Sequence, residues 1–208
     1  MKRHPLRRRS EAGPTGMRHR QRRRAGPLVA LSCALALAAQ AAETGHEGPG
    51  HRMVWDAKGM VMGENRGDAL PADCPAISED VSLEVRVGRK HAPAGFVYGY
   101  SDYQWRVPPC SRVSVTLVNE DEVRHMWMLH GLPSYIYAQG MFHLEAEGRR
   151  TMTGTFIVPG DDRTYLVHCD IAQHTEKGLK AQLKVGEGSG DLPSVPGITA
   201  PRYTGDAD

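Results

Sequence analysis

The residues best suited to chemistry are one cysteine and two histidines. Cys169 and His174 are separated by four residues, and His125 lies on a separate segment, six residues after Asn119. A thiolate and imidazoles from distant segments can converge on one metal ion, and two histidines with one cysteine in a trigonal arrangement form a copper site for electron transfer. We therefore predict that His125, Cys169 and His174 bind one copper ion that cycles between Cu(I) and Cu(II).

Two other interpretations of these residues stay open. Zinc takes similar ligands, but a zinc site with one cysteine and two histidines usually has a fourth donor or a water. In the second interpretation, the three side chains bind no metal and are ordinary core or surface residues. A cysteine and two histidines on strand-like segments form an uncommon combination, so we favour copper.

Three further histidines suggest a second site. His130 follows His125 by five residues, and His168 directly precedes Cys169. Side chains alternate between the two faces of a strand, so an odd offset reverses the face. If His125 and Cys169 face the first site, His130 and His168 face away together, and His143 is the candidate third ligand of a second copper ion. The alternative is that these three are surface histidines.

The segments that must position these side chains have the pattern of β-strands. Val81, Leu83, Val85 and Val87 alternate with polar residues, which is the two-residue period of a half-buried strand. Similar short runs recur between clusters of Gly, Pro, Asn and Asp, and no segment shows a long helical period. The sequence predicts an all-β, antiparallel Greek-key β-sandwich over residues 81–186. The expected strands are 81–87, 96–100, 104–107, 113–117, 125–129, 151–158, 164–169 and 179–185, with 131–140 as the longest loop.

The segments that flank this domain have a different composition. Residues 43–80 are rich in Gly, Pro and acidic residues and are predicted to form an extended lead, and residues 187–208 are predicted to form a disordered tail. The lead also carries imidazoles and thioethers, which suit Cu(I), so copper delivery is an alternative role. These side chains are His46, His51, Met53, Met60 and Met62.

Residues 1–42 match a secretory signal peptide, with a basic region, a short apolar run and a small-residue cleavage site. We expect cleavage after Ala41 or Ala42, export to the periplasm and no transmembrane segment in the mature chain. Residues 1–16 are either a long basic region or a spurious extension. A lipid attached at Cys33 is an alternative interpretation.

The charge distribution limits the classes of partner. Ten of the 26 basic residues and one of the 24 acidic residues lie in residues 1–42. Residues 43–208 therefore keep 16 basic and 23 acidic residues, a net charge of −7. An acidic body argues against nucleic acid or an anionic membrane surface as the main partner.

The remaining cysteines differ in their expected role. An oxidising compartment favours a disulfide between Cys74 and Cys110, which would connect the lead to the sheet. Two separate buried thiols are the alternative. Cys169 then stays unpaired, which agrees with a role as a metal ligand.

Around the predicted ligands the chain resembles the cupredoxins. The resemblance rests on a valine-rich strand that ends at Asn119, then His125, and a Cys169-x4-His174 loop followed by a closing strand. It covers residues 81–186, and its loop spacing is similar to that of azurins. The family usually supplies a weak axial methionine four or five residues after the last histidine. Leu179 occupies that region here, so the resemblance implies either three-coordinate copper or a substitute donor, for which the candidates are Gln173, Glu176, Met126 and Met128.

The arrangement of His130 and His168 is similar to the first domain of copper nitrite reductases. The resemblance implies two possible activities. The first is a one-electron carrier, with Ile171 and Ala172 in the docking surface and the acidic residues 120–122 steering a basic partner. Its partner would be a periplasmic redox protein such as a cytochrome or a copper oxidoreductase. The second is a copper oxidoreductase with a catalytic second copper, so the sequence leaves open whether the protein is an enzyme.

Overall fold

The computed structural model describes residues 52–200, which form eleven strands and two short 3-10 helices. The strands alternate with short loops, and their burial alternates as it does in half-buried sheets. The strands are β1 Arg52–Asp56, β2 Gly59–Glu64, β3 Asp80–Gly88, β4 Gly99–Tyr100, β5 Gln104–Val107, β6 Arg112–Asn119, β7 His125–His130, β8 Met141–Ala146, β9 Thr151–Ile157, β10 Arg163–His168 and β11 Lys180–Val185; the helices are η1 Arg89–His91 and η2 Ala138–Gly140.

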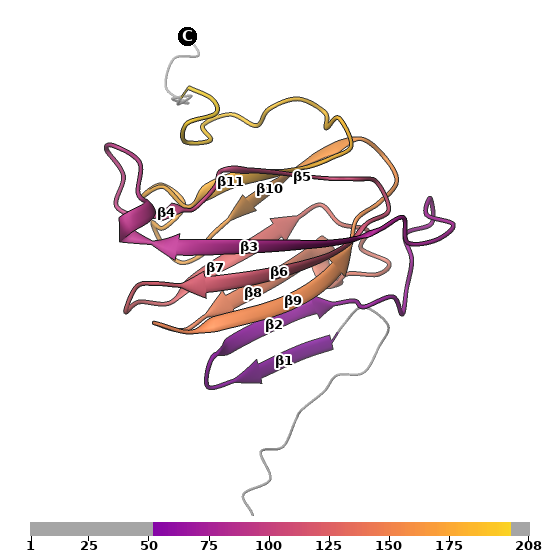
Figure 1. The fold of residues 1–208 in the computed structure, drawn as a ribbon, viewed down its shortest axis with the longest axis horizontal. Helices are drawn as coiled ribbons and strands as arrows, with labels where there is room; N and C mark the ends of the chain where they lie inside the picture. Colours follow the sequence, from indigo (N-terminus) through magenta and orange to yellow (C-terminus); the bar gives the residue numbers. More distant parts are fainter. Residues whose placement is uncertain (1–51, 201–208) are drawn as a thin grey trace, which may run out of the picture. The chain divides into compact units, whose positions relative to one another are not determined.

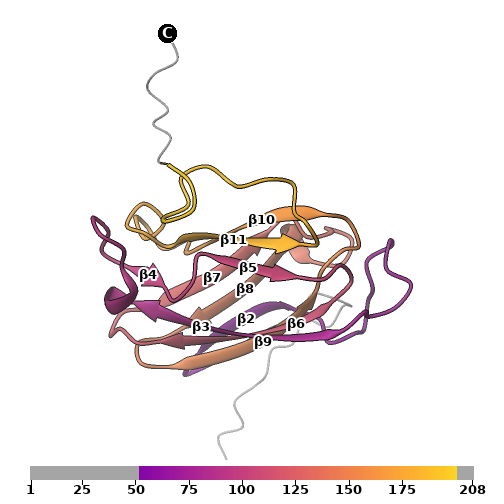
Figure 2. The same cartoon turned by 45° about the horizontal axis from the view of Figure 1, so that its top comes forward.

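The strands form two sheets that pack face to face. One has seven strands in the order β1-β2-β8-β7-β10-β11-β5, and the other has four in the order β4-β3-β6-β9. The four-stranded sheet lies in front in Figure 1, and Figure 2 separates the layers, with β10 and β11 above β6 and β9. The predicted all-β sandwich is confirmed.

Both sheets are mixed, whereas the sequence pattern predicted antiparallel pairing throughout. β3 pairs with β6 in parallel along its whole length, and β11 pairs with β5 in parallel. Parallel neighbours need a long crossover connection. The segment from η1 through β4 and β5 supplies the crossover between β3 and β6, and a local alternation pattern carries no information about it.

The core lies between the sheets and is built from the inward side chains of both. In β6, Val113, Val115 and Leu117 are fully buried and alternate with half-buried polar residues. Trp127 of β7 is fully buried against Phe142 and Phe156, with ring centroids 6.2 and 6.0 Å away, and the two phenylalanine rings are 4.6 Å apart. The aromatic cluster therefore joins β7 and β8 of one sheet to β9 of the other.

Residues 52–64 correct the predicted extended lead of residues 43–80. They form the hairpin of β1 and β2, and β2 pairs with β8 so that Val61 lies opposite Leu144. Strand β8 was also missed, and residues 131–140 lead into it. These strands are rich in Met and Gly and lack the β-branched alternation that marks a strand in sequence. His46 and His51 lie outside the described residues.

Residues 187–200 correct the predicted disordered tail of residues 187–208. Val195 is fully buried, and Lys180 Nζ donates to the carbonyl of Pro193 over 2.6 Å. The Gln182 side chain bonds to Asp191 and to the backbone of Leu192. This segment packs along β11, as Figures 1 and 2 show. Residues 201–208 lie outside the description.

The predicted signal peptide, residues 1–42 with Cys33, also lies outside the described residues. Between residues 52 and 200 no helix reaches the length and apolar character that a membrane span requires.

The predicted disulfide between Cys74 and Cys110 is present, with an S–S distance of 2.08 Å and a sequence separation of 36. It connects the segment before β3 to the turn before β6. Cys169 is the one free cysteine among the described residues, and it is buried.

Removal of this disulfide is expected to destabilise the domain. Closing a loop of this length restricts the unfolded chain by about 3 to 4 kcal/mol. We expect the Cys74→Ala/Cys110→Ala variant to lose a free energy of unfolding of this size in urea titration of the metal-free protein. A loss below about 1 kcal/mol would show that the segment before β3 is held by other contacts.

Candidate metal centre

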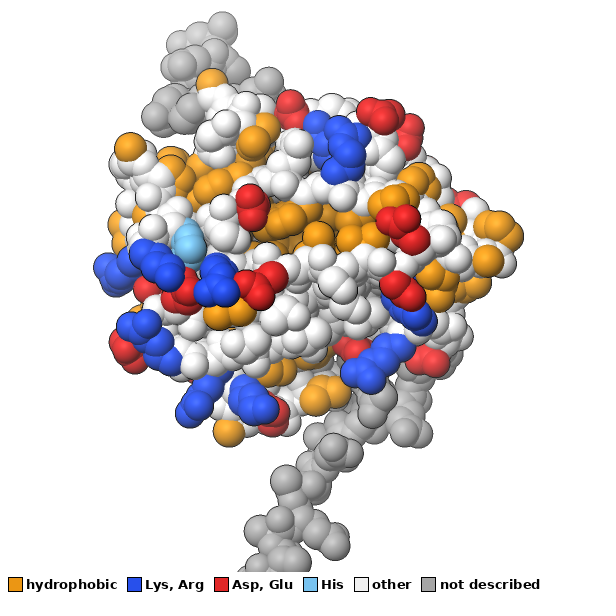
Figure 3. Space-filling view, in the orientation of Figure 1, with side chains coloured by type: hydrophobic (Ala, Val, Ile, Leu, Met, Phe, Trp, Pro, Cys, Tyr) orange, Lys and Arg blue, Asp and Glu red, His pale blue; other side chains and the backbone are white. Residues whose placement is uncertain are grey.

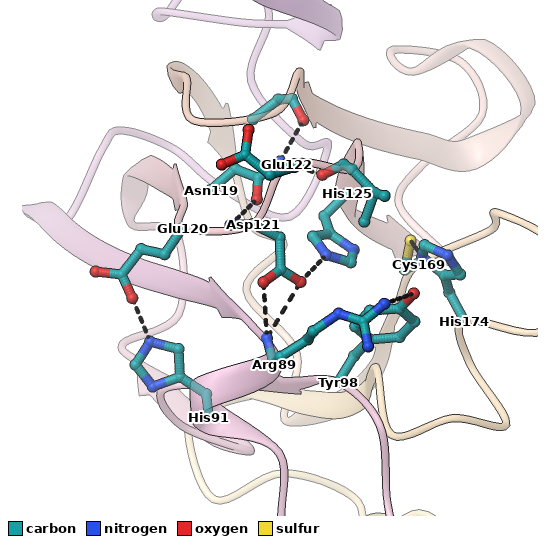
Figure 4. Close-up of polar contacts among 12 residues, drawn as sticks. Arg89, His91, Tyr98, Asn119, Glu120, Asp121, Glu122, His125, Cys169 and His174 are labelled. Carbon is teal, nitrogen blue, oxygen red and sulfur yellow. Dashed lines mark hydrogen bonds and ion pairs between the residues drawn. The ribbon is translucent and has the colours of Figure 1, made fainter. Parts of the chain in front are cut away.

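The structure brings His125, Cys169 and His174 together at one end of the sandwich. One ligand atom from each lies within 4.8 Å of the other two, and all three residues are buried. Cys169 Sγ is 3.5 Å from His174 Nδ1, and the two imidazole centroids are 5.0 Å apart. Figure 4 shows the thiol and both rings directed toward one another.

The pairing of two central strands explains why the first two residues meet. His125 is the first residue of β7, and Cys169 directly follows the last residue of β10. These strands are antiparallel neighbours, with Val167 opposite Leu129. The start of β7 therefore lies at the same end of the sheet as the end of β10. Both side chains face the core, because His125 alternates with Met126 and Cys169 has the parity of Val167.

The third residue is placed by a loop whose ends are joined through Leu179. The Leu179 N–H donates to the carbonyl of His174 over 3.0 Å, and the Cys169 N–H donates to the carbonyl of Leu179 over 3.1 Å. The Thr175 hydroxyl also donates to the carbonyl of Cys169 over 2.7 Å. At Gly178, with φ +118°, a Cβ would lie 2.3 Å from the carbonyl oxygen of Tyr98. The loop is therefore held by backbone contacts and by the Thr175 hydroxyl.

A second set of hydrogen bonds fixes the approach to His125. The Asn119 amide donates to the carbonyls of Val123, Ala146 and Glu147, and its oxygen accepts from the Asp121 N–H. This turn directs the Asp121 carboxylate into the site (Figure 4).

The Asp121 carboxylate accepts hydrogen bonds from His125 Nε2 over 2.9 Å and from the Arg89 N–H over 3.1 Å. A carboxylate on one ring nitrogen fixes the proton there and leaves the other nitrogen as a lone-pair donor.

The donor atoms of the site fit a copper ion. His125 Nδ1 is fully buried and has no hydrogen-bond partner, although its ring is held at Nε2. A buried polar atom without a partner is costly, and a metal ion would satisfy it. One soft thiolate with two imidazoles is the ligand set that suits copper. The residues present therefore fit copper.

The protonation of the three side chains follows from burial. Burial raises the pKa of the Cys169 thiol to about 11, against the backbone hydrogen bonds of Ile171 and Met126. Burial, and then the charges of His125 and Lys177, lower the pKa of His174 to about 4. Burial also lowers the pKa of His125, although Asp121 opposes the shift. At pH 7 the metal-free site therefore holds a neutral thiol and two neutral imidazoles.

Tyr98 is part of the site, although no motif or spacing in the sequence indicates this role. Its ring centroid lies 4.9 Å from that of His125 and 4.6 Å from that of His174. The Arg89 guanidinium sits 5.1 Å from the centroid of the same ring. Tyr98 lies in the expected strand 96–100, and only packing across the fold brings it onto both imidazoles.

The proposed substitutes for an axial ligand are not placed inside the site. Met126 and Met128 alternate with His125 and Trp127, so their side chains are on the opposite face of β7. Gln173 and Glu176 are exposed. Leu179 is fully buried in the same apolar cluster as Cys169, and its side chain has no donor atom.

The histidines of the predicted second site share one face without converging as a three-ligand site. The rings of His130 and His168 stack at 4.9 Å on the outer face, as the alternation predicted. His143 lies on the neighbouring strand β8. Within residues 52–200, however, the group of His125, Cys169 and His174 is the one set of three histidine, cysteine or carboxylate residues whose donors converge within 4.8 Å.

The side chains of the acidic run 120–122 are paired with other residues of the chain, and the predicted steering role stays a prediction. Glu120 is bonded to Arg86, Lys90 and His91, and Lys90 foremost holds its pKa at about 2. Asp121 is buried against His125, and Glu122 pairs with Arg149. Acidic and basic side chains are also interspersed on the face in Figure 3.

Among the comparisons with known proteins, only the comparison with solved structures finds similar chains. No protein-family model and no curated protein matches the chain. Auracyanin A, a blue copper protein from Chloroflexus aurantiacus, is 20% identical with a TM-score of 0.41, over 51% of this chain and 99% of that one. A blue copper oxidase from Nitrosomonas europaea is 18% identical with a TM-score of 0.42, over 56% of this chain and 41% of that one. Reduced auracyanin from Roseiflexus castenholzii is 17% identical with a TM-score of 0.39, over 51% of this chain and 97% of that one.

Copper binding is expected to release one proton per ion at pH 7. The Cys169 thiol must lose its proton to coordinate, while His125 and His174 are already neutral because their pKa values are lowered. The apparent affinity should therefore rise about tenfold per pH unit from pH 7 toward the thiol pKa. Titration calorimetry with Cu(II) in buffers of different ionisation enthalpy measures the proton count. The Cys169→Ser variant is the control, and release of two or more protons from the parent chain would contradict this description.

Proposed function

We propose that the protein is an exported one-electron carrier, with copper bound by His125, Cys169 and His174. The observation that carries the proposal is the convergence of these three buried donors within 4.8 Å. Bound copper supplies a couple between Cu(I) and Cu(II). A ligand frame that is already formed changes little between the two oxidation states, which favours rapid electron transfer.

The chain's own residues give the site the other properties of a carrier. His125 and Cys169 have no exposed surface, so water is excluded from them. Asp121 fixes the tautomer of His125, and Leu179 joins the backbones of Cys169 and His174. These contacts hold the ligands in place without using the metal, so the ligands need no rearrangement when the charge at the site changes.

The surface beside His174 is the proposed place for electron exchange. Phe96 and Val97 are 37% and 40% exposed, and the N–H of Val97 donates to the carbonyl of Lys177 in the ligand loop. With Ile171 and Ala172 of the same loop they form an apolar surface, which we call the ligand-loop face. A partner that covers this face would approach the copper on the side of its least buried ligand.

A periplasmic redox protein, such as a cytochrome or a copper oxidoreductase, is the proposed partner. The signal-like residues 1–42 and the Cys74–Cys110 disulfide support export to an oxidising compartment. The acidic residues 120–122 are internally paired, so apolar contact on the ligand-loop face is the expected basis of binding.

A copper oxidoreductase with a second copper is the second candidate. The stacked rings of His130 and His168 favour it, and His143 is the third candidate ligand. Such an enzyme would need the chain to bring these three donors closer together or to take a ligand from a second chain.

The ligand-loop face can be tested without a known partner. Electron self-exchange between two copies of a carrier requires their copper-proximal surfaces to meet. We expect Val97→Asp to slow self-exchange at least tenfold, measured by NMR line broadening in mixtures of Cu(I) and Cu(II) protein. Ile198→Asp is the matched control, because Ile198 is also 40% exposed and lies in the C-terminal segment.

Equal rates for the two variants would contradict the proposed surface. Steady reduction of oxygen or nitrite by the copper-loaded parent protein, at several turnovers per second with an electron donor, would instead establish the oxidoreductase.

A further inference from the structure

One face of the seven-stranded sheet gathers most of the methionines of the chain. Six of the nine methionines and three histidines have side chains on the face that points away from the core. Their strand neighbours, such as Val61, Trp127 and Leu144, point into the core, and side chains alternate along a strand. We call this surface the methionine–histidine face, and it consists of Met53, Met60, Met62, Met126, Met128, Met141, His130, His143 and His168.

The strand register aligns five of these residues in one row. Met53 lies opposite Met62, which lies opposite His143 on β8. His143 lies opposite Met128 on β7, which lies opposite His168 on β10. Directly opposed residues of antiparallel strands have Cβ atoms about 5 Å apart. Three thioethers and two imidazoles therefore lie in one row across five neighbouring strands.

The centre of the row already contains close donor contacts. His130 Nε2 lies 3.0 Å from Met128 Sδ. The ring of His168 stacks on that of His130 with centroids 4.9 Å apart, and its Nδ1 lies 3.3 Å from the Thr175 hydroxyl. The other ring nitrogen of His168, Nε2, is not used by that contact. One thioether and two imidazoles thus lie within one small region of the face.

His143 supplies an independent observation that points to a ligand. Its side chain is 7% exposed, and its Nε2 is buried with no hydrogen-bond partner. The nearest carboxylate oxygen, on Glu145, is 3.6 Å away, which is beyond hydrogen-bond distance. Burial lowers the pKa of His143 to about 4, with smaller effects from Asp170, Arg124, His130 and His168. The imidazole is therefore neutral at pH 7 and has an unused nitrogen.

We propose that the methionine–histidine face binds Cu(I) through Met128, His130 and His143. Thioether sulfur is a soft donor that selects Cu(I), and imidazole accepts copper in either state. Hard cations such as Ca²⁺ and Mg²⁺ require oxygen ligands, which this row lacks.

Access to this site is provided by the surrounding methionines. Met60, Met62, Met126 and Met141 are each partly exposed and lie at the margin of the site. Methionines that served only to fill the core would point inward, as Met152 of β9 does. The site is also separate from the first centre, because the two lie on opposite faces of β7 and β10.

The test uses the full chain with Cys169→Ser, which removes the first centre and makes this inference independent of the proposed electron carrier. Under anaerobic conditions we expect this protein to withdraw one equivalent of Cu(I) from bicinchoninate. Met128→Leu and His143→Gln, each added to that background, should weaken Cu(I) binding at least tenfold. Met152→Leu is the matched control for the methionine change and should bind as the background does.

X-ray absorption at the copper edge supplies the second measurement, and we expect sulfur scattering that Met128→Leu diminishes. Thermal melts of the metal-free variants establish that each one is folded. The inference would be overturned if the Cys169→Ser background left Cu(I) with bicinchoninate, or if Met128→Leu and Met152→Leu bound equally. Coordination by nitrogen alone would also overturn it and would favour the second copper of an oxidoreductase.

Discussion

The convergence of one thiol and two imidazoles in a space closed to water is the constraint on which the rest of this structure depends. Buried polar groups without partners are costly, and His125 Nδ1 is such a group. The fold holds the donors in place by contacts that need no metal. On one side the Asn119 amide shapes the turn that carries Asp121, and on the other Leu179 joins both ends of the ligand loop. A bound copper ion would give the buried donor atoms a partner. The surrounding hydrogen bonds fix the positions of the three side chains.

The alternation of side chains places two separate groups of candidate copper ligands on opposite faces of the same strands. The inner faces of β7 and β10 end in His125 and Cys169, which are held between aromatic and aliphatic residues of the core. Their outer faces present Met128, His130 and His168. The ligands of the inner site are buried, whereas the outer face carries methionines that are partly exposed. A closed site suits repeated electron transfer, and an open thioether surface suits the uptake and release of a soft ion.

The parts of the structure that depend on local pattern were predictable from sequence. The spacing of Cys169 and His174 and the alternation around Val85 and Val115 correctly indicated the converging ligands and the central strands. The parts that depend on distant contacts were not. Parallel pairing of β3 with β6 leaves no mark on either strand, and β1, β2 and β8 lack β-branched alternation. Tyr98 and Asp121 become site residues only through packing. Glu120 of the acidic run is paired with Arg86 and Lys90, which precede it in the chain by 34 and 30 residues.

The central claim is that His125, Cys169 and His174 hold one copper ion through a direct bond to sulfur. Visible and electron paramagnetic resonance spectra of the protein with one equivalent of Cu(II) test it most directly. If copper is bound to the Cys169 sulfur, we expect an intense thiolate-to-copper absorption band and a small copper hyperfine splitting. Both should be lost in Cys169→Ser. A weakly coloured protein with a wide hyperfine splitting that Cys169→Ser leaves unchanged would show that copper binds elsewhere.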